Sequence, residues 1–338
     1  MKERIEWIDW LKGIALVLVI IGHTFRTSMY SENMIYGHIK SFIYAFHMPL
    51  FISISGFLFQ SNRNNYMNIN ILDFFRNKWK SYMKPLINYA TIMYIIFSIF
   101  SIIPGFKKML GRVGLIEYFL LTIAGENPYS VHLWYLLTTF LIVITCYVVL
   151  KISSKTHYNE MIVLFALAFV LWNIRIIFGE DFCMTVKSYW KYSIFFVFGM
   201  ILNRKKIDVP TKYYLLLSGF SWVYIFIYST GIINTTMFLY RYLKNALVLI
   251  SCFVIISNFY DIARSVFCHS KFIKYIGKNS MVFYLFHQPF CAMLGIVLFD
   301  KIGLPGYSVC LFCFLGSIIL PELVILAGKI NKFVRAAL

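Results

Sequence analysis

Residues 9–23 read DWLKGIALVLVIIGH, an apolar run with a cation near its start and an imidazole at its end. On an α-helix, the eleven steps from Lys12 to His23 return to within about 20° of the same face and rise about 16 Å. The two side chains are therefore predicted to share one stripe of a membrane-spanning helix. Asp9 lies one turn before Lys12 on that stripe, close enough to form an ion pair.

These charged groups have two interpretations. In the first, Asp9 and Lys12 mark the membrane boundary and His23 ends the span. In the second, which we favour, they belong to a reaction centre, because a titratable group inside an apolar span is costly and usually marks a pathway or an active site. Histidine suits proton transfer near neutral pH, and a desolvated His23 is expected to stay neutral and basic.

The composition predicts a membrane protein. The chain has 338 residues, of which 60% are hydrophobic and only 14% are charged, which is too apolar for a soluble domain of this size. Dividing by about 20 residues per span plus a loop gives about ten crossings. We expect an all-α, polytopic integral membrane bundle that forms a single membrane-embedded domain over residues 1–338, with no separate soluble domain. The expected spans are 11–29, 39–60, 85–104, 131–150, 160–178, 188–203, 213–230, 241–260, 279–299 and 308–330.

The charge distribution predicts the orientation. A formal charge of +18 could indicate nucleic-acid binding, but no soluble basic domain is expected to carry that role. The cations concentrate in alternate loops, as the positive-inside rule requires if both termini are cytoplasmic. The charged residues Asp9 and Lys12 interrupt the N-terminal apolar stretch and no small-residue cleavage site follows, so we expect a retained first span in the cell membrane.

The second expected span contains Phe46-His47-Met48-Pro49, followed by Ser55-Gly56. Proline in mid-span frees backbone groups that must find partners inside the protein. His47 either bonds to that loosened backbone or lies in a cavity shared with His23. The small residues Ser55 and Gly56 permit close packing against a neighbouring helix.

Residues 61–84 form a basic loop with interspersed apolar residues, which predicts a helix lying at the membrane interface. Its cations either anchor the loop to anionic lipid headgroups or bind the phosphates of a ligand. In the second case the residues would be Arg76, Lys78, Lys80 and Lys84.

On the opposite side, 105–130 is the longest outer segment, and its part 113–124 is apolar enough for a re-entrant or interfacial helix. Trp134 and Tyr135 open the next span and are typical of an aromatic belt at the membrane boundary, the interpretation that we favour. With Glu126 and His132 they also resemble the lining of a carbohydrate site.

The ninth expected span places His287 beside a proline. Cys310 and Cys313 form a CxxC inside an apolar helix without other ligands nearby, and we interpret them as packing residues. We find no metal-ligand cluster and no glycine-rich phosphate loop in the sequence.

Several of these motifs, in this order, resemble the membrane acyltransferase-3 family and, more narrowly, its fucose 4-O-acetylase-like branch. The matching motifs are Lys12-Gly-Ile with His23, Phe46-His47-Met48-Pro49-Leu50-Phe51 with Ser55-Gly56, Lys84-Pro85, His132-Leu133-Trp134-Tyr135-Leu136, and Ser280 with Tyr284-Leu285-Phe286-His287. The resemblance runs from the N-terminus to the tenth expected span.

The resemblance implies an O-acyltransferase that takes an acetyl group from cytoplasmic acetyl-coenzyme A, a co-substrate rather than a bound cofactor, and transfers it to a hydroxyl of a cell-envelope or exported glycan. His23 would be the general base or a transient acyl acceptor. Lys12, supported by Asp9, occupies the position where the family has an arginine, so it keeps the charge and loses the bidentate fork. His47, Ser55, Glu126, His132, Trp134, Tyr135 and His287 would bind substrate. The other expected partners are the carbohydrate acceptor, membrane lipid and a second copy of the chain in a homodimer.

Two rival functions fit the same features. A transporter or flippase of a glycan or lipid-linked sugar would also have kinked helices and buried polar groups, although its halves are often related in sequence, and we detect no repeat here. A catalytically silent partner of an envelope assembly complex is the third possibility. Consumption of acetyl-coenzyme A distinguishes an enzyme from both.

Overall fold

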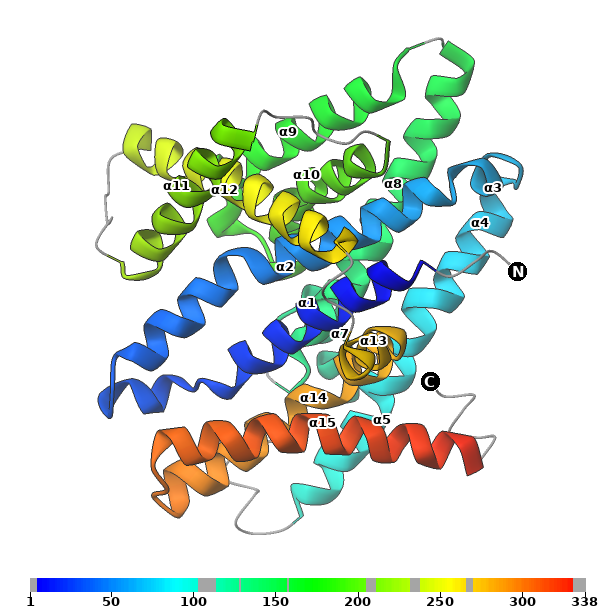
Figure 1. Cartoon of the computed structure of the whole chain (residues 1–338). Coiled ribbons are helices and arrows are strands. Elements are labelled where there is room, and N and C mark those ends of the chain that lie inside the picture. The colour runs from blue at the N-terminus through cyan, green and yellow to red at the C-terminus, as the bar shows by residue number, and fades with distance from the viewer. Residues whose placement is uncertain are drawn as a thin grey trace. The chain divides into compact units, whose positions relative to one another are not determined.

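The computed structural model describes residues 5–102, 114–127, 129–156, 158–204, 211–231, 238–265 and 270–330, and their regular structure is entirely helical (Figure 1). They form two compact units. One is drawn from Met1–Gln60 and Phe198–Val324, and the other from Ser61–Val197 and Ile325–Leu338. We describe each unit separately.

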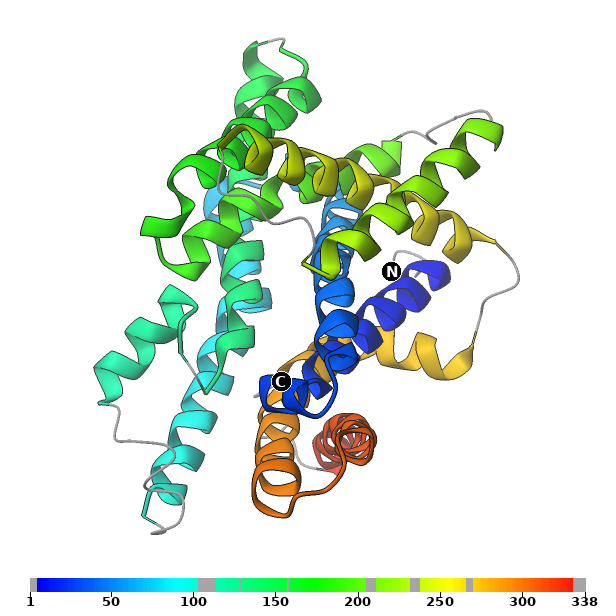
Figure 2. The same cartoon turned by 90° about the vertical axis from the view of Figure 1, so that its left-hand side faces the viewer.

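The first unit combines the N-terminal helices with the C-terminal ones, so segments far apart in sequence lie together, as α1 and α13 do in Figures 1 and 2. Its helices are α1 (Glu6–Thr24), the 3₁₀ turn η1 (Thr27–Ser31), α2 (Ile35–Ser61), α11 (Thr211–Ser229), α12 (Phe238–Arg264), α13 (Lys271–Lys278), α14 (Ser280–Gly295), the π-helical turn η5 (Ile296–Lys301) and α15 (Gly306–Ile330).

Helix α1 begins five residues earlier than the predicted span 11–29 and also ends five residues earlier. It ends because the next residue, Phe25, is extended, with φ −83° and ψ 109°. It begins early because its polar first turn has a partner: Lys274 of α13 lies 2.6 Å from the carboxylate of Glu6. Lys12 is therefore two turns inside the helix, and His23 lies in the last turn.

Helix α2 runs unbroken through Pro49. Proline has no N–H to donate to the carbonyl four residues earlier, which is that of Ala45. The thiol of Cys252 on α12 supplies the missing donor, with Sγ 3.3 Å from that oxygen. Helix α2 makes a second close contact one turn later, where Gly199 lies directly against the carbonyl of Ser53.

The second unit is built around α8 and the segments on either side of it. Its helices are α3 (Arg63–Met67), α4 (Ile71–Lys78), the π-helical turn η2 (Trp79–Met83), α5 (Lys84–Phe100), α7 (Leu115–Ala124), the 3₁₀ turn η3 (Val131–Leu133), α8 (Trp134–Thr156), α9 (Glu160–Phe178), the 3₁₀ turn η4 (Gly179–Asp181) and α10 (Met184–Arg204), which continues into the first unit.

The predicted helix over 113–124 is present as α7, and residues 103–113 lie outside the described residues. The basic segment 61–84 also forms helices. Its helix α4 is capped by Asn70, whose Oδ1 accepts a hydrogen bond from the Asp73 N–H at 2.8 Å while its Nδ2 donates to the Asp73 carboxylate at 2.8 Å. This cap satisfies one backbone donor at the start of a short helix, and the bond between the two side chains holds Asn70 in place.

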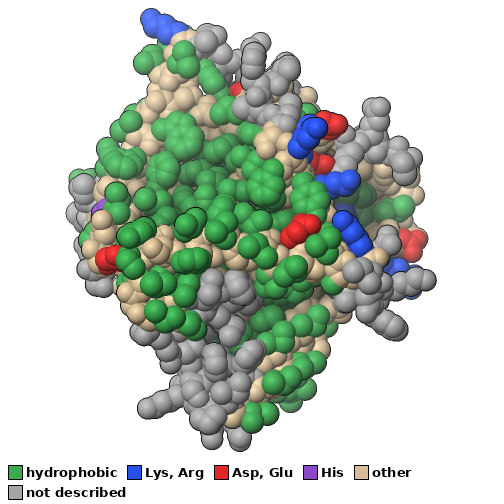
Figure 3. Space-filling view, turned by 60° about the horizontal axis from the view of Figure 1, so that its bottom comes forward, with side chains coloured by type: hydrophobic (Ala, Val, Ile, Leu, Met, Phe, Trp, Pro, Cys, Tyr) green, Lys and Arg blue, Asp and Glu red, His purple; other side chains and the backbone are tan. Residues whose placement is uncertain are grey.

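Among the described residues, 6 helices are long and apolar enough to cross a membrane: α1, α2, α8 with the turn before it, α9, α12 and α15. The other predicted spans coincide with α5, α10, α11 and the α14–η5 segment. The count of ten and the orientation of the termini stay predictions. Figure 3 shows a face on which hydrophobic side chains predominate, with most of the charged side chains on its right-hand side. Such a surface suits contact with lipid rather than water, and the chain is a multi-pass membrane protein.

Candidate functional site

The predicted site residues fall into two groups, one in each unit. His23, Lys12, Asp9, His47, Ser55 and His287 belong to the first unit, and Arg76, Lys78, Lys80, Lys84, Glu126, His132, Trp134 and Tyr135 belong to the second.

One unbroken helix, α1, carries all three predicted catalytic residues. The Lys12 ammonium lies 3.5 Å from Oδ1 of Asp9, and both side chains are largely buried, with 22% and 10% of their surfaces exposed. Burial strengthens this ion pair because little water screens it. The helix carries on without a kink to His23, so the predicted spacing between the ammonium and the imidazole applies along a single rigid element.

His23 lies between two segments that are distant in sequence. Its Nδ1 is 3.1 Å from the hydroxyl of Tyr44 on α2. The ring of His287 on α14 lies on another side, with the two ring centroids 5.2 Å apart. The thiol of Cys291, also on α14, donates to the His23 carbonyl at 3.5 Å. The sequence offered no local signal for Tyr44 except that it precedes His47 by three residues and so shares its helix face.

The other two histidines have assignable tautomers. Nδ1 of His47 lies 2.8 Å from the carbonyl of Ile43, and Nδ1 of His287 lies 2.8 Å from the carbonyl of Tyr284. A carbonyl only accepts, so each Nδ1 carries a proton. His47 thus bonds to backbone, although not to the Ala45 carbonyl that Pro49 leaves open, and its ring also lies 4.9 Å from that of Tyr44. The predicted bond to the backbone that Pro49 loosens is therefore wrong, and the cavity shared with His23 stays a prediction.

Packing holds α14 in place beside this group. The backbone carbonyl of His287 accepts a hydrogen bond from the Ser317 hydroxyl at 3.2 Å. Cys313 is buried in an apolar cluster with Met29 and Cys291, which agrees with the packing role predicted for the CxxC. Ser55, predicted to contact substrate, is half-buried on α2, with its hydroxyl 3.4 Å from the carbonyl of Phe51.

In the second unit, the four cations predicted to bind donor phosphates differ in their surroundings. Arg76 is exposed and lies 3.7 Å from the carboxylate of Asp73. Lys80 and Lys84 are also exposed. Lys78 is half-buried and donates to the Tyr66 hydroxyl at 2.8 Å, and burial lowers the pKa of its ammonium from 10.5 to about 8.

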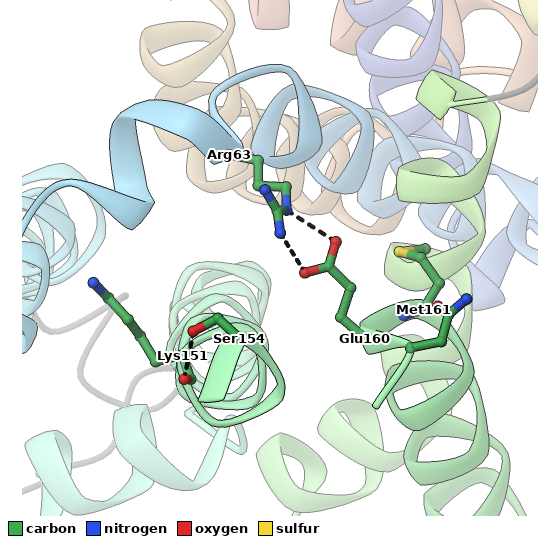
Figure 4. A network of polar contacts seen from close by, with 6 residues as sticks. Arg63, Lys151, Ser154, Glu160 and Met161 are labelled. Carbon is green, nitrogen blue, oxygen red and sulfur yellow. Dashed lines mark hydrogen bonds and ion pairs between the residues drawn. The ribbon is translucent and has the colours of Figure 1, made fainter. Parts of the chain in front are cut away.

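The basic segment is fastened to α8 and α9 by contacts that the sequence did not reveal. Arg63 makes two hydrogen bonds to the carboxylate of Glu160 at the start of α9, at 2.9 and 2.6 Å (Figure 4). Phe74 stacks on Tyr147 of α8 with ring centroids 3.9 Å apart, and Lys151 donates to the Met67 carbonyl at 2.8 Å. The exposed cations are therefore displayed from a docked segment rather than from a free loop.

The predicted carbohydrate residues lie around the start of α8. Trp134 stacks on Tyr192 with centroids 5.2 Å apart, and both Trp134 and Tyr135 are buried. Belt residues face the lipid headgroups, so the aromatic-belt interpretation is wrong for this pair. His132 is buried edge-on against the ring of Tyr89. Glu126 is exposed, and its carboxylate accepts a hydrogen bond from the N–H of Met184 at 3.3 Å.

Comparison with known proteins gives the family. The sequence model of an acyltransferase domain, that of the acyltransferase-3 family, matches residues 5–321. A nodulation protein, NolL, of Sinorhizobium fredii (strain NBRC 101917 / NGR234) is 42% identical over 52 residues, which are 15% of this chain and 14% of that protein. NolL of Mesorhizobium japonicum (strain LMG 29417 / CECT 9101 / MAFF 303099) is 47% identical over 53 residues, with the same coverage. The chain thus matches about one seventh of the length of these relatives, and no solved structure matches it.

The family match covers nearly the whole chain, including the helices that carry Lys12, His23, His47 and His287. It favours an enzyme over the transporter and over the silent partner. The chain is a multi-pass membrane protein and belongs to the acyltransferase-3 family.

Proposed function

We propose that this acyltransferase is an O-acetyltransferase, which moves the acetyl group of cytoplasmic acetyl-coenzyme A to a sugar hydroxyl of a cell-envelope or exported glycan. The observation that carries the proposal is the group at the end of α1, where His23 bonds to Tyr44 at 3.1 Å and faces the imidazole of His287. A base flanked by groups that fix its orientation is what acyl transfer to an alcohol requires.

The proposed chemistry conserves atoms and charge. Neutral His23 takes the proton of the sugar hydroxyl as the oxygen attacks the thioester carbonyl. The C–S bond then breaks, coenzyme A leaves as its thiolate, and the proton on His23 passes to that sulfur. In the alternative order, the imidazole attacks first and an acetyl-imidazole is passed to the sugar. Both routes give the same products, an acetyl ester and free coenzyme A.

Lys12 supplies a positive charge at the other end of the same helix. It lies about 16 Å from His23 along the axis, which is of the order of the length of a pantetheine arm. A donor with its anionic groups near Lys12 could therefore present its thioester near His23. The exposed cations Arg76, Lys80 and Lys84 are further candidates for the donor phosphates, since they project from a segment that is held in place.

The experiment uses the purified full chain in lipid vesicles with acetyl-labelled acetyl-coenzyme A, with and without a glycan acceptor. We expect slow release of label by hydrolysis and faster transfer to a suitable sugar. His23→Ala should bind the donor and lose the transfer. His38→Ala is the matched control, because it removes another half-buried histidine, near the start of α2.

Normal transfer by a folded His23→Ala protein would reject the histidine mechanism. Failure of the unmodified protein to consume the donor with any acceptor, together with movement of a glycan across the vesicle, would reject acetyl transfer in favour of transport. Glycan analysis of cells lacking the protein would identify the acceptor through the loss of one acetyl group from a defined sugar.

A further inference from the structure

Tyr44 is held in one position beside the proposed base. On one side its ring lies against Gly22, so close that a methyl group added there would be 2.6 Å from Cε1 of Tyr44. On another side it packs against the ring of His47, with centroids 4.9 Å apart. The Lys40 ammonium lies 5.4 Å from the ring centre and is itself bound to the carbonyl of Phe25 at 2.9 Å. With the ring fixed in this way, the hydroxyl has little freedom to leave Nδ1 of His23.

The hydrogen bond between Tyr44 and His23 bears on which ring nitrogen of His23 reacts. A neutral imidazole has one protonated nitrogen and one basic nitrogen, and its hydrogen-bond partners help to set which is which. The Tyr44 hydroxyl lies 3.1 Å from Nδ1 of His23 and can donate or accept. Nε2 is the base in the tautomer in which Nδ1–H donates to the phenol oxygen. Once Nε2 has taken a proton from an alcohol, both nitrogens carry protons, and Nδ1–H must donate to an acceptor. The phenol oxygen of Tyr44 is that acceptor.

We propose that Tyr44 is a positioning residue that accepts a hydrogen bond from Nδ1–H of His23, and thereby directs Nε2 to the sugar hydroxyl and stabilises the imidazolium formed in the reaction. The inference rests on the proposed function, in which His23 is the base. It goes further by naming the reacting nitrogen and the residue that selects it. The phenol oxygen accepts the hydrogen bond that a carboxylate or a backbone carbonyl accepts from other catalytic histidines.

Other titratable groups around His23 also bear on its protonation. From α14 these are the imidazole of His287 and the thiol of Cys291. From α2 they are Tyr44 itself and, beyond its ring, His47 and Lys40. None of these is altered by a substitution that removes only the Tyr44 hydroxyl, so a change in the pH profile can be assigned to that one hydrogen bond.

The test is Tyr44→Phe, which keeps the ring and deletes the hydroxyl. We expect kcat for acetyl transfer to fall by about 10–100-fold, as for other partners that orient a reactive histidine, with an unchanged KM for acetyl-coenzyme A. The acid limb of the pH–rate profile should move to lower pH, because the imidazolium has lost its acceptor and forms less readily. Tyr36→Phe is the matched control, since it removes the hydroxyl of a half-buried tyrosine on the same helix that stacks on Phe25. It should change neither kcat nor the profile.

A second variant covers the case in which Tyr44→Phe does not fold. Gly22→Ala leaves the phenol in the protein and pushes its ring away from the position that bonds to His23. It should give the same fall in kcat without a change in the KM for the donor. A kcat and pH profile equal to those of the unmodified protein, in either variant, would overturn the role of Tyr44.

His23→Ala, measured in parallel, separates the two proposals. If His23→Ala is inactive while folded Tyr44→Phe is normal, the role of Tyr44 is rejected and the function of His23 stands. If His23→Ala is active, the proposed mechanism itself fails.

Discussion

The packing of α1 against α13 makes a quantitative prediction for Gly277→Ala. A methyl group at position 277 would collide with the backbone carbonyl of Asp9, and at 2.8 Å it would also be too close to the N–H of Gly13. Backbone cannot move aside as a flexible side chain can, so the two helices would have to separate. Overpacking of this kind lowers the free energy of unfolding by about 1–3 kcal/mol. The higher helix propensity of alanine offsets only about 1 kcal/mol of that loss.

Because both obstructing groups are backbone, we expect the upper part of that range, with a net loss of about 2 kcal/mol in the free energy of unfolding. At about 2–4 °C per kcal/mol, the apparent Tm should fall by about 4–8 °C. The assay is thermal unfolding of the purified protein in detergent, followed by tryptophan fluorescence. Gly219→Ala on α11 is the matched control, since nothing lies within 4 Å of the added methyl group. It should keep or slightly raise the Tm.

A companion variant tests whether the loss comes from the helix contact. Gly13 faces the carbonyl of Ile273 across the same crossing, so Gly13→Ala should also destabilise. The double variant should lose less than the sum of the two single losses, because helices already separated by one methyl group have room for the second. A Gly277→Ala protein that melts with the unmodified protein, beside a normal Gly219→Ala control, would refute the backbone contact between α1 and α13.

Two further predictions concern the second unit. Glu160→Gln should lower the stability by about 1–2 kcal/mol, the range for losing a charge-assisted hydrogen-bond pair that is partly exposed. It should also speed proteolysis within residues 61–84, since the carboxylate that holds Arg63 is gone, and unchanged cleavage would show that the ion pair does not fasten the segment. For Lys78, the folded pKa of about 8 lies below the ordinary value of 10.5, so the unfolded chain binds more protons between these pH values and stability should rise with pH across that window. The Lys78→Met protein should lack this rise, and an equal rise in both proteins would refute the assignment to Lys78.

The sequence was sufficient to predict the long helices of the first unit but not the short α13 or the helix partners. Apolar runs are local signals, and they predicted α2, α12 and α15 within a few residues. The start of α1 was missed because the polar residues Glu6 and Asp9 argue against a span when read alone. Both residues contact α13 through Lys274 and Gly277. This helix lies some 260 residues later in the chain, in a segment whose sequence predicts only a loop between spans.

In the candidate site too, a contact within one helix could be predicted from the sequence, and contacts between distant helices could not. The spacing of three residues correctly predicted the pairing of Asp9 with Lys12, since this contact lies within one helix. The contact of His23 with His287 joins residues 264 positions apart, which no local pattern predicts. Nor does the sequence single out Tyr44, because a tyrosine in an apolar helix is ordinary. Trp134 and Tyr135 were assigned to the lipid boundary because position along a span does not reveal which side chains face the protein interior.

The contacts of α13 and α14 with α1 also explain how the first unit fixes the position of α1. Gly277 meets α1 at Asp9, and the next helix, α14, meets α1 at His23 through His287 and Cys291. The α13–α14 segment therefore touches α1 near both ends of the interval that the proposal assigns to the donor. A helix braced at both ends cannot slide or tilt without breaking one of the two contacts. On this reasoning, Gly277→Ala should impair transfer as well as stability, because parting the helices at one end also shifts the imidazole at the other.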